Sequence, residues 1–359
     1  MKKAVMYGAG SIGRGFIGQL FYISGYETCF IDVNQEIIDL LNNEHQYTLT
    51  IASPNGYKSE YIRNIHAISG NDTDKAASEI AECEIMATAV GENILKFIAP
   101  VIAKGIDQRK TPLNIIVCEN MMNSDEYLKS LIRPYIKNMD FFENNIGFIQ
   151  ASVGRMVPVV VSNNPLEVIV EQYNQLQIDK DKIVGTFPEI KNILQYSPFE
   201  SMKKRKLYMH NMSHAVCAYL GKIKGYEYIY QAIEDKAIQD IVRGALLESA
   251  NAISKSYGVS LDELIAHGED LIERYHNKYL RDTIERVGRD PKRKLKRDDR
   301  LIGAALFCLS NEINPEYILI GIKAALSYEK ELSMTDTQLK ETEPLYEMII
   351  KASLPALNT

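Results

Sequence analysis

Residues 4–13 read Ala4-Val5-Met6-Tyr7-Gly8-Ala9-Gly10-Ser11-Ile12-Gly13, a short apolar run followed by three spaced glycines. The pattern Gly-x-Gly-x-x-Gly after a strand is typical of a tight turn that leads into a helix. The first glycine permits the turn, the second lets the backbone approach a diphosphate, and the third allows close helix packing. Because the first N–H groups of a helix attract anions, this stretch predicts a phosphate-binding turn.

An acidic residue ends the next predicted strand. Asp32 stands 19 residues after Gly13, where a carboxylate can accept hydrogen bonds from ribose hydroxyls and would repel the 2′-phosphate of NADP. Neither Val33 nor Asn34 supplies a compensating positive charge. We therefore predict NAD as the cofactor, with binding residues Gly8, Gly10, Ser11, Ile12, Gly13, Asp32, Ala89 and Val90. The alternative is a glycine-rich turn that binds another ligand or none.

The order of hydrophobic patterns predicts two domains. Short apolar runs alternate with helical patterns at 4–7, 28–33, 84–90, 113–118, 146–153 and 166–177. This alternation is typical of a parallel, doubly wound sheet, and residues 47–68 around Pro54-Asn55-Gly56 predict an inserted β-hairpin. After Pro198 the patterns are helical, at 199–223, 226–256, 260–276, 299–311 and 314–329. The predicted fold class is α/β, with a Rossmann domain over 1–195 and a mainly α-helical substrate and catalytic domain over 196–359.

The composition favours a small-molecule partner. Lys and Arg number 41 against 47 Asp and Glu, so a net charge of −6 provides no general field for nucleic acid or anionic membrane. No apolar run approaches the roughly 20 residues that span a bilayer, and the five cysteines form no Cys-x-x-Cys pair. We expect a cytoplasmic protein with reduced thiols that is a monomer or weak dimer.

Further segments match a known family pattern. They include Thr88-Ala89-Val90-Gly91, Cys118-Glu119-Asn120-Met121, Asn164-Pro165-Leu166-Glu167-Val168, Tyr279-Leu280-Arg281-Asp282, and Lys206, Asn211 and His214 in the spacing Lys-x4-Asn-x2-His. Over nearly the whole chain they resemble the mannitol-1-phosphate 5-dehydrogenases of the polyol-specific long-chain dehydrogenase family. The resemblance implies that Lys206 is the general base in alcohol oxidation and that Asn211 and His214 bind the reacting oxygen. Asn120 resembles the family's second amide at that oxygen.

This chemistry places a demand on the lysine. A general base must be neutral, and because the ordinary lysine pKa is about 10.4, burial or nearby positive charge has to lower it. Lys203 and Arg205 could supply that charge. On an α-helix of about 3.6 residues per turn, Lys206, His210, His214 and Asn211 fall at roughly 0°, 40°, 80° and 140°, with Lys206 and His214 about 12 Å apart along the axis. Taken alone, Lys206 would be interpreted as a solvated surface lysine. His214 alone would be interpreted as a core histidine whose hydrogen bonds are satisfied.

Two histidines also stand at the spacing of paired zinc ligands. His210 and His214 are four residues apart, but Asn211 stands where His-Glu-x-x-His needs its glutamate, so we predict no metal. A zinc alcohol dehydrogenase would need clustered cysteines and histidines. A short-chain dehydrogenase would need Tyr-x-x-x-Lys, which none of the 21 tyrosines provides.

A basic segment contrasts with the acidic chain. Eight of the fifteen residues from Arg286 to Arg300 are Lys or Arg. Arginine binds phosphate oxygens in a bidentate manner, so we expect some of Arg286, Arg289, Arg293 and Lys294 to bind a substrate phosphate. The predicted function is the NAD-dependent interconversion of mannitol 1-phosphate and fructose 6-phosphate. The alternative for the basic segment is a solvated surface between helices. The alternative functions are a dehydrogenase of unphosphorylated polyols and a dehydrogenase of hexonates such as altronate and fructuronate.

One departure from the family weakens the substrate prediction. The family commonly has Val-Asp-Arg where this chain has Val153-Gly154-Arg155, so a carboxylate expected near the catalytic amides is absent. A catalytically silent NAD-binding protein is the alternative that this departure favours, because fold alone does not determine activity.

Overall fold

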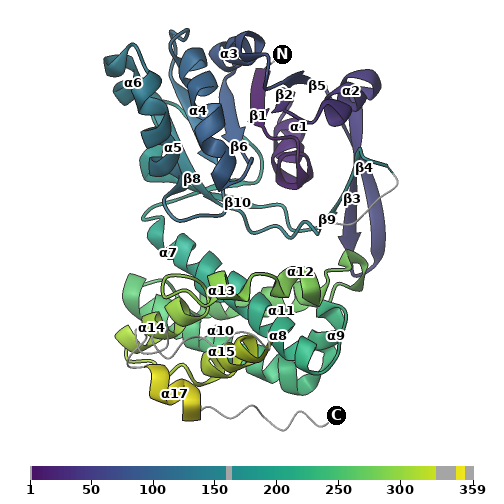
Figure 1. Cartoon of the computed structure of the whole chain (residues 1–359), viewed down its shortest axis with the longest axis vertical. Helices are drawn as coiled ribbons and strands as arrows, with labels where there is room; N and C mark the ends of the chain where they lie inside the picture. Colours follow the sequence, from purple (N-terminus) through teal and green to yellow (C-terminus); the bar gives the residue numbers. More distant parts are fainter. Residues whose placement is uncertain (1, 159–163, 329–344, 352–359) are drawn as a thin grey trace. The chain divides into compact units, whose positions relative to one another are not determined.

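The chain folds into two units, Met1–Glu200 and Ser201–Thr359. The computed structural model describes residues 2–158, 164–328 and 345–351. The first unit contains a mostly parallel sheet covered by helices, and the second unit consists mainly of helices (Figure 1). This arrangement confirms the predicted fold class. Residues 329–344 and 352–359 of the predicted helical domain lie outside the described residues.

The large sheet of the first unit has the strand order β11-β10-β8-β7-β6-β1-β2-β5. From β8 to β5 neighbouring strands are parallel. Strands β2 and β5 lie on one side of β1 and strands β6, β7 and β8 on the other, so the point at which the strand order reverses lies between β1 and β6. Among the described strands of this sheet, β10 runs antiparallel to its neighbour β8, and β11 is parallel to β10. The strands are β1 (Lys2–Tyr7), β2 (Tyr26–Asp32), β5 (Ile65–Ser69), β6 (Ile85–Thr88), β7 (Leu113–Val117), β8 (Ile146–Ser152), β10 (Leu176–Asp179) and β11 (Ile193–Tyr196).

A second sheet of three strands contains the predicted hairpin. β3 (Gln46–Ser53) and β4 (Gly56–Arg63) pair antiparallel, closed by Pro54-Asn55, and β3 pairs parallel with β9 (Glu167–Glu171). The single apolar run predicted over 166–177 is therefore wrong as one strand. It contains β9 and β10, which belong to different sheets. The mostly polar stretch Gln172-Tyr173-Asn174-Gln175 separates the two strands.

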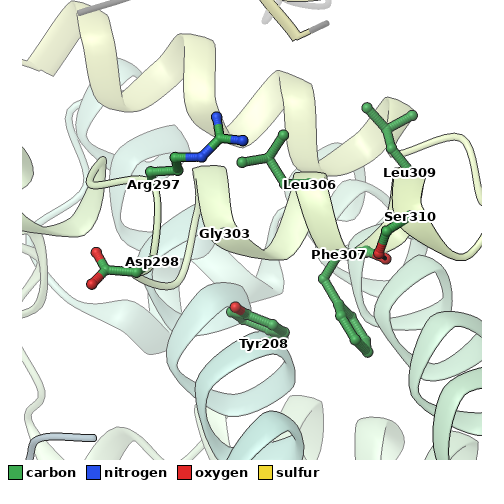
Figure 2. Close-up of a pocket in the computed structure, with 8 residues that line it drawn as sticks. All are labelled: Tyr208, Arg297, Asp298, Gly303, Leu306, Phe307, Leu309 and Ser310. Carbon is green, nitrogen blue, oxygen red and sulfur yellow. Dashed lines mark hydrogen bonds between the residues drawn. The ribbon is translucent and has the colours of Figure 1, made fainter. Parts of the chain in front are cut away.

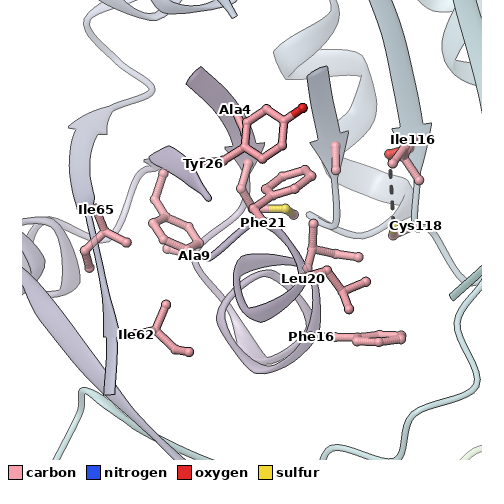
Figure 3. Packing of buried hydrophobic residues seen from close by; sticks show 14 of the residues in the cluster. Ala4, Ala9, Phe16, Leu20, Phe21, Tyr26, Ile62, Ile65, Ile116 and Cys118 are labelled. Atoms are coloured by element: carbon pink, nitrogen blue, oxygen red, sulfur yellow. Dashed lines mark hydrogen bonds between the residues drawn. The ribbon is translucent and has the colours of Figure 1, made fainter. Parts of the chain in front are cut away.

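Helices cover both faces of the large sheet. Alternate β1 residues point to opposite faces, so Ala4 and Met6 join one core and Val5 and Tyr7 the other. Figure 3 shows part of the first core, where the rings of Phe21 and Tyr26 lie side by side with centroids 6.0 Å apart. The helical segments of this unit are η1 (Gly13–Ile17), α1 (Gly18–Ile23), α2 (Gln35–Glu44), α3 (Thr73–Glu82), α4 (Glu92–Ile106), α5 (Ser124–Ile132), η2 (Arg133–Tyr135), α6 (Met139–Asn145) and η3 (Lys180–Lys182).

The second unit is a helical domain around one buried helix. Ten consecutive residues of α8 are buried, from Met212 to Gly221, and α9, α10, α12 and α15 pack on it. Within the described ranges, no helix has both the length and the apolarity to cross a bilayer. The helices are α7 (Glu200–Lys204), η4 (Arg205–Asn211), α8 (Met212–Ile223), α9 (Ile229–Glu234), α10 (Lys236–Tyr257), α11 (Leu261–Tyr275), η5 (Lys278–Leu280), α12 (Ile284–Gly288), α13 (Pro291–Lys294), α14 (Ile302–Ser310), α15 (Glu316–Tyr328) and α17 (Leu345–Lys351).

Candidate active site

The glycine turn follows β1 and is packed too tightly for side chains at two positions. Gly8 has a φ of +106°, and a Cβ atom there would lie 2.5 Å from the Ala89 carbonyl oxygen. A Cβ atom at Gly13 would lie 1.9 Å from the Gly8 carbonyl oxygen. Both positions therefore require glycine, the first for its backbone conformation and the second for the close approach of helix and turn.

The predicted cofactor residues meet at one place in the sheet. The Ala89 N–H donates to the Tyr7 carbonyl (2.9 Å), so the ends of β1 and β6 lie side by side where the strand order reverses. Ligands of open α/β sheets bind in the crevice at this point. A Cβ atom at Gly10 would have no neighbour within 4 Å among the described residues, so the turn leaves room above its backbone. The open turn and the first N–H groups of the following helix fit a dinucleotide diphosphate.

Asp32 ends β2 beside this turn. Its Oδ2 atom accepts the Ala9 N–H (2.6 Å), and its Oδ1 atom accepts the N–H groups of Val33 (2.8 Å) and Asn34 (3.0 Å). A carboxylate offers about four acceptor positions, so about one is left for a ribose hydroxyl. Asp32 therefore has a structural role in the turn besides the predicted contact with ribose.

Glu119 is a residue of this site that the sequence reasoning did not single out. Its buried carboxylate accepts the N–H groups of Val90 (2.9 Å) and Gly91 (2.8 Å), which ties the end of β7 to the end of β6. Asn120, the next residue, is exposed. The only signal for Glu119 in the sequence was its place within Cys118-Glu119-Asn120-Met121.

Two of the three predicted catalytic residues of the second unit, Lys206 and Asn211, lie on a π-helix, so the α-helical angles expected for this segment are wrong. η4 covers Arg205–Asn211, and at its end the Met212 N–H donates to the Leu207 carbonyl five residues earlier. A π-helical turn takes about one residue more than an α-helical turn. Lys206 and Asn211, which are five residues apart, consequently come closer to the same face than an α-helix would allow. Lys206 and Asn211 are partly buried, whereas His214 is buried on α8.

His214 is held by an aromatic ring and by a carboxylate. Its imidazole stacks on the Tyr275 ring, with centroids 4.9 Å apart and an interplanar angle of 11°. The Asp282 Oδ2 atom lies 3.1 Å from Nε2 of His214. That oxygen stands off the direction of the ring N–H, so among the described residues Nε2 has no well-directed hydrogen-bond partner. Tyr275 and Asp282 are further residues that the sequence reasoning did not single out.

The electrostatics around η4 favour neutral histidines. Burial lowers the pKa of His214, the Asp282 carboxylate opposes this shift, and the charges of Arg286 and Lys206 add to it. Burial together with the charges of Lys206 and Arg274 lowers the pKa of His210 well below its usual value. Neutral imidazoles can donate to or accept from an alcohol without adding a full charge.

The four basic residues predicted to bind phosphate differ in their surroundings. Arg286 donates two hydrogen bonds to Asp282 (2.7 and 2.8 Å), and Arg293 donates to Asp290 (2.9 Å). Arg289 is exposed. Lys294 is only 3% exposed and donates to the Arg289 carbonyl, and burial together with the charges of Arg300 and Arg293 lowers its pKa to about 7.

The position that lacks the family carboxylate is enclosed by an aromatic residue. Gly154 is buried, and a Cβ atom there would lie 3.3 Å from the Tyr173 ring. The Tyr173 hydroxyl accepts a hydrogen bond from the Gln177 side chain (2.6 Å). An aspartate at this position would therefore require Tyr173 to move.

Other features lie away from these residues. A pocket of about 850 Å³ in the second unit is lined by Tyr208, Arg297, Asp298, Gly303, Leu306, Phe307, Leu309 and Ser310, none of which is a predicted site residue (Figure 2).

A group of three possible metal ligands lies in the first unit. In the part of the chain that the structure describes, possible ligand atoms of Cys29, His66 and Glu79 lie within 4.8 Å of one another. Burial raises the pKa of the Cys29 thiol well above its usual value, and His66 lies 3.4 Å from Glu27 and 3.6 Å from Glu79, so ion pairing explains this group.

A glycine turn at the reversal point of a Rossmann sheet, followed by a helical domain, defines a two-domain dehydrogenase of the Rossmann type. Residues 2–192 match the mannitol dehydrogenase Rossmann domain, and residues 197–357 match the mannitol dehydrogenase C-terminal domain. The chain belongs to the mannitol dehydrogenase family and is a polyol dehydrogenase.

The family relationship extends to a protein of similar length. The chain is 38% identical over 337 residues to a mannitol-1-phosphate 5-dehydrogenase of Thermoanaerobacter pseudethanolicus, covering 92% of this chain and 86% of the relative. Two solved structures share the fold. A substrate-free D-sorbitol dehydrogenase is 15% identical, with a TM-score of 0.77 over 90% of this chain and 79% of its own. Pseudomonas fluorescens mannitol 2-dehydrogenase, solved with NAD and D-mannitol, is 16% identical, with a TM-score of 0.73 over 91% of this chain and 79% of its own.

Proposed function

We propose that the protein catalyses the NAD-dependent interconversion of mannitol 1-phosphate and fructose 6-phosphate. The observation that carries the proposal is the arrangement of Lys206 and Asn211 on a π-helix that runs directly into the helix of the buried His214. The relative that is 38% identical over most of the chain bears the name of this activity, which supports the choice of substrate.

The N-terminal domain is proposed to hold the cofactor. The turn offers backbone N–H groups to the diphosphate, from Gly8, Gly10, Ser11, Ile12 and Gly13. Asp32 favours NAD over NADP, because its carboxylate would repel a 2′-phosphate. Ala89 and Val90 border the same crevice. NAD, when bound, accepts the hydride of the alcohol. Asn120 is proposed as a further ligand of the reacting oxygen.

The helical domain is proposed to handle the proton and the oxygen. Lys206 removes the hydroxyl proton as the general base, and Asn211 and His214 donate hydrogen bonds to the oxygen as negative charge develops on it. The neutral state of His214 suits this role, because a neutral N–H donor stabilises the charge without competing for the proton.

The phosphate is proposed to bind in the basic segment. Arg289 and Lys294 fit this role best, since the first is exposed and the second is a buried amine among positive charges. Arg293 and Arg286 already have carboxylate partners and would contribute a weaker attraction.

A substrate panel tests the reaction. Formation of NADH is followed with mannitol 1-phosphate, mannitol, other polyols and hexonates. Charge-assisted hydrogen bonds contribute roughly 1.5–3 kcal/mol each, so we expect kcat/KM for mannitol 1-phosphate to exceed that for mannitol by about 100-fold or more. Equal values for the two polyols would contradict the phosphate assignment, and no turnover of any substrate would favour a silent NAD-binding protein.

Replacement of the proposed base tests the mechanism. Lys206→Ala should lower kcat by about 10²–10⁴-fold because no group remains to take the proton, while NADH affinity stays within about twofold of wild type. Fluorescence titration measures the affinity. Lys222→Ala removes an exposed lysine from α8 and should leave both quantities unchanged. Turnover of Lys206→Ala at the wild-type rate would rule out the base.

A further inference from the structure

A buried carboxylate, paired with a partly exposed arginine, lies beside the histidine of the proposed site. Asp282 is 5% exposed, and both of its carboxylate oxygens accept hydrogen bonds from Arg286, at 2.7 and 2.8 Å. The same carboxylate places Oδ2 3.1 Å from Nε2 of His214. Asp282 follows η5, whereas His214 lies on α8, so the approach of Asp282 to His214 connects two separate parts of the domain.

The charge of Asp282 determines which ring nitrogen of His214 carries a proton. Burial opposes ionisation of the carboxyl group, but the nearby His214 ring and the charge and hydrogen bonds of Arg286 hold the pKa of Asp282 below its usual range. An ionised carboxylate can only accept hydrogen bonds. The Asp282 oxygen lies 3.1 Å from Nε2, to one side of the direction in which the ring N–H or the lone pair points. At this distance the negative carboxylate repels a lone pair on Nε2 and attracts a positively polarised N–H, so Nε2 carries the single proton of the neutral ring.

The ring is also prevented from turning away. It stacks on Tyr275, whose hydroxyl donates to the His210 carbonyl (3.1 Å) and lies 2.9 Å from the Ser213 hydroxyl. Stacking fixes the plane of the imidazole, and in this plane the Nε2–H bond lies beside the carboxylate but does not point at it. That N–H remains able to donate to a second oxygen.

We propose that Asp282, clamped by Arg286, is a positioning residue that fixes His214 as the Nε2–H tautomer, so that this nitrogen donates a hydrogen bond to the reacting oxygen. The proposal rests on the proposed function for the identity of that oxygen. It assigns Arg286 to the support of His214 rather than to the substrate phosphate. Asp282 acts through His214 and contacts no substrate.

Nitrogen NMR of the full-length protein with labelled histidine tests the proposal directly. The signals of His214 are assigned by their loss in His214→Gln, and the shifts of its two nitrogens show which one is protonated. We expect Nε2 to be protonated in the wild type. In Asp282→Asn, whose neutral amide can face either tautomer, we expect a mixture or a shift towards the Nδ1–H form.

The kinetic counterpart separates positioning from folding. Asp282→Asn should lower kcat by about tenfold or more, with a smaller change in KM and unchanged NADH affinity. The matched control is Glu269→Gln, which breaks the bidentate pair between Glu269 and Arg243 elsewhere in the domain and should leave kcat and the tautomer unchanged.

Two results would overturn the proposal. One is a wild-type His214 protonated at Nδ1, which needs no variant and so decides the matter even if Asp282→Asn does not fold. The other is an Asp282→Asn protein with the wild-type tautomer and wild-type kcat. Full activity of Lys206→Ala would instead overturn the proposed function, while the tautomer of His214 would still report on Asp282.

Discussion

Asp32 shows how one residue can serve both the fold and the choice of cofactor. Three backbone N–H groups converge on its carboxylate, one of them from Ala9 inside the glycine turn. The hydrogen bonds bring the turn and the end of β2 together before any ligand binds. A substitution here therefore changes both the shape of the turn and its preference between dinucleotides.

The cofactor preference can be measured with Asp32→Ala. Loss of the hydrogen bond to ribose should weaken NADH binding by about 10–100-fold, while loss of the negative charge should favour NADPH relative to NADH. Fluorescence titration gives both dissociation constants. Asp39→Ala, an exposed acid on α2, is the matched control and should change neither. An unchanged ratio of the two constants in Asp32→Ala would disprove the role in selection.

The lowered pKa of Lys294 predicts that the protein takes up a proton when the substrate phosphate binds. A pKa of about 7 leaves the buried amine mostly neutral at about pH 8. A phosphate dianion beside it favours the charged form, so binding of mannitol 1-phosphate should take up a proton. Calorimetry in buffers of different ionisation enthalpy measures this uptake. It should disappear in Lys294→Met, and an equal uptake in that variant would place the phosphate elsewhere.

At the level of secondary-structure elements, Glu248 links α10 to the start of α15. Its carboxylate accepts the N–H groups of Tyr317 (2.7 Å) and Ile318 (3.0 Å). Burial outweighs these hydrogen bonds and raises the pKa of Glu248 to about 7. A raised pKa in the folded state means that folding favours the protonated acid. The resulting stability is present below the unfolded value of 4.5 and is lost as the pH rises to about 7.

Glu248→Gln should remove this pH dependence. Between about pH 5 and about pH 8 the free energy of unfolding of the wild type should fall by on the order of 2–3 kcal/mol more than that of the variant, whose amide does not titrate. Urea unfolding followed by circular dichroism at both pH values measures the difference. Parallel curves for the two proteins would show that Glu248 is not the titrating group.

Across the whole molecule, the elements that depend on local patterns were predictable from the sequence. The alternating runs at 4–7, 28–33 and 113–118 became β1, β2 and β7 because their side chains are buried in a two-sided sheet. The hairpin followed from Pro54-Asn55-Gly56. The parallel, doubly wound sheet followed from the alternation of strand and helix patterns.

The features that sequence reasoning missed depend on contacts between distant residues. Glu119 was not singled out because its partners Val90 and Gly91 belong to another strand end. Asp282 likewise acquires its role only when the fold brings it to His214. The π-helix was missed for a different reason, since the same residues favour an α-helix equally well and tertiary packing selects the wider turn.

The wide turn at Arg205–Asn211 also affects how the site would respond to a change in chain length. The turn holds about one residue more than an α-helical turn, and deletion of one residue between Lys206 and Asn211 would leave these two residues four apart, a spacing that an α-helix places on one face. Such a deletion would therefore keep the two side chains close together, whereas the same deletion in a regular α-helix would rotate one side chain by about 100° relative to the other.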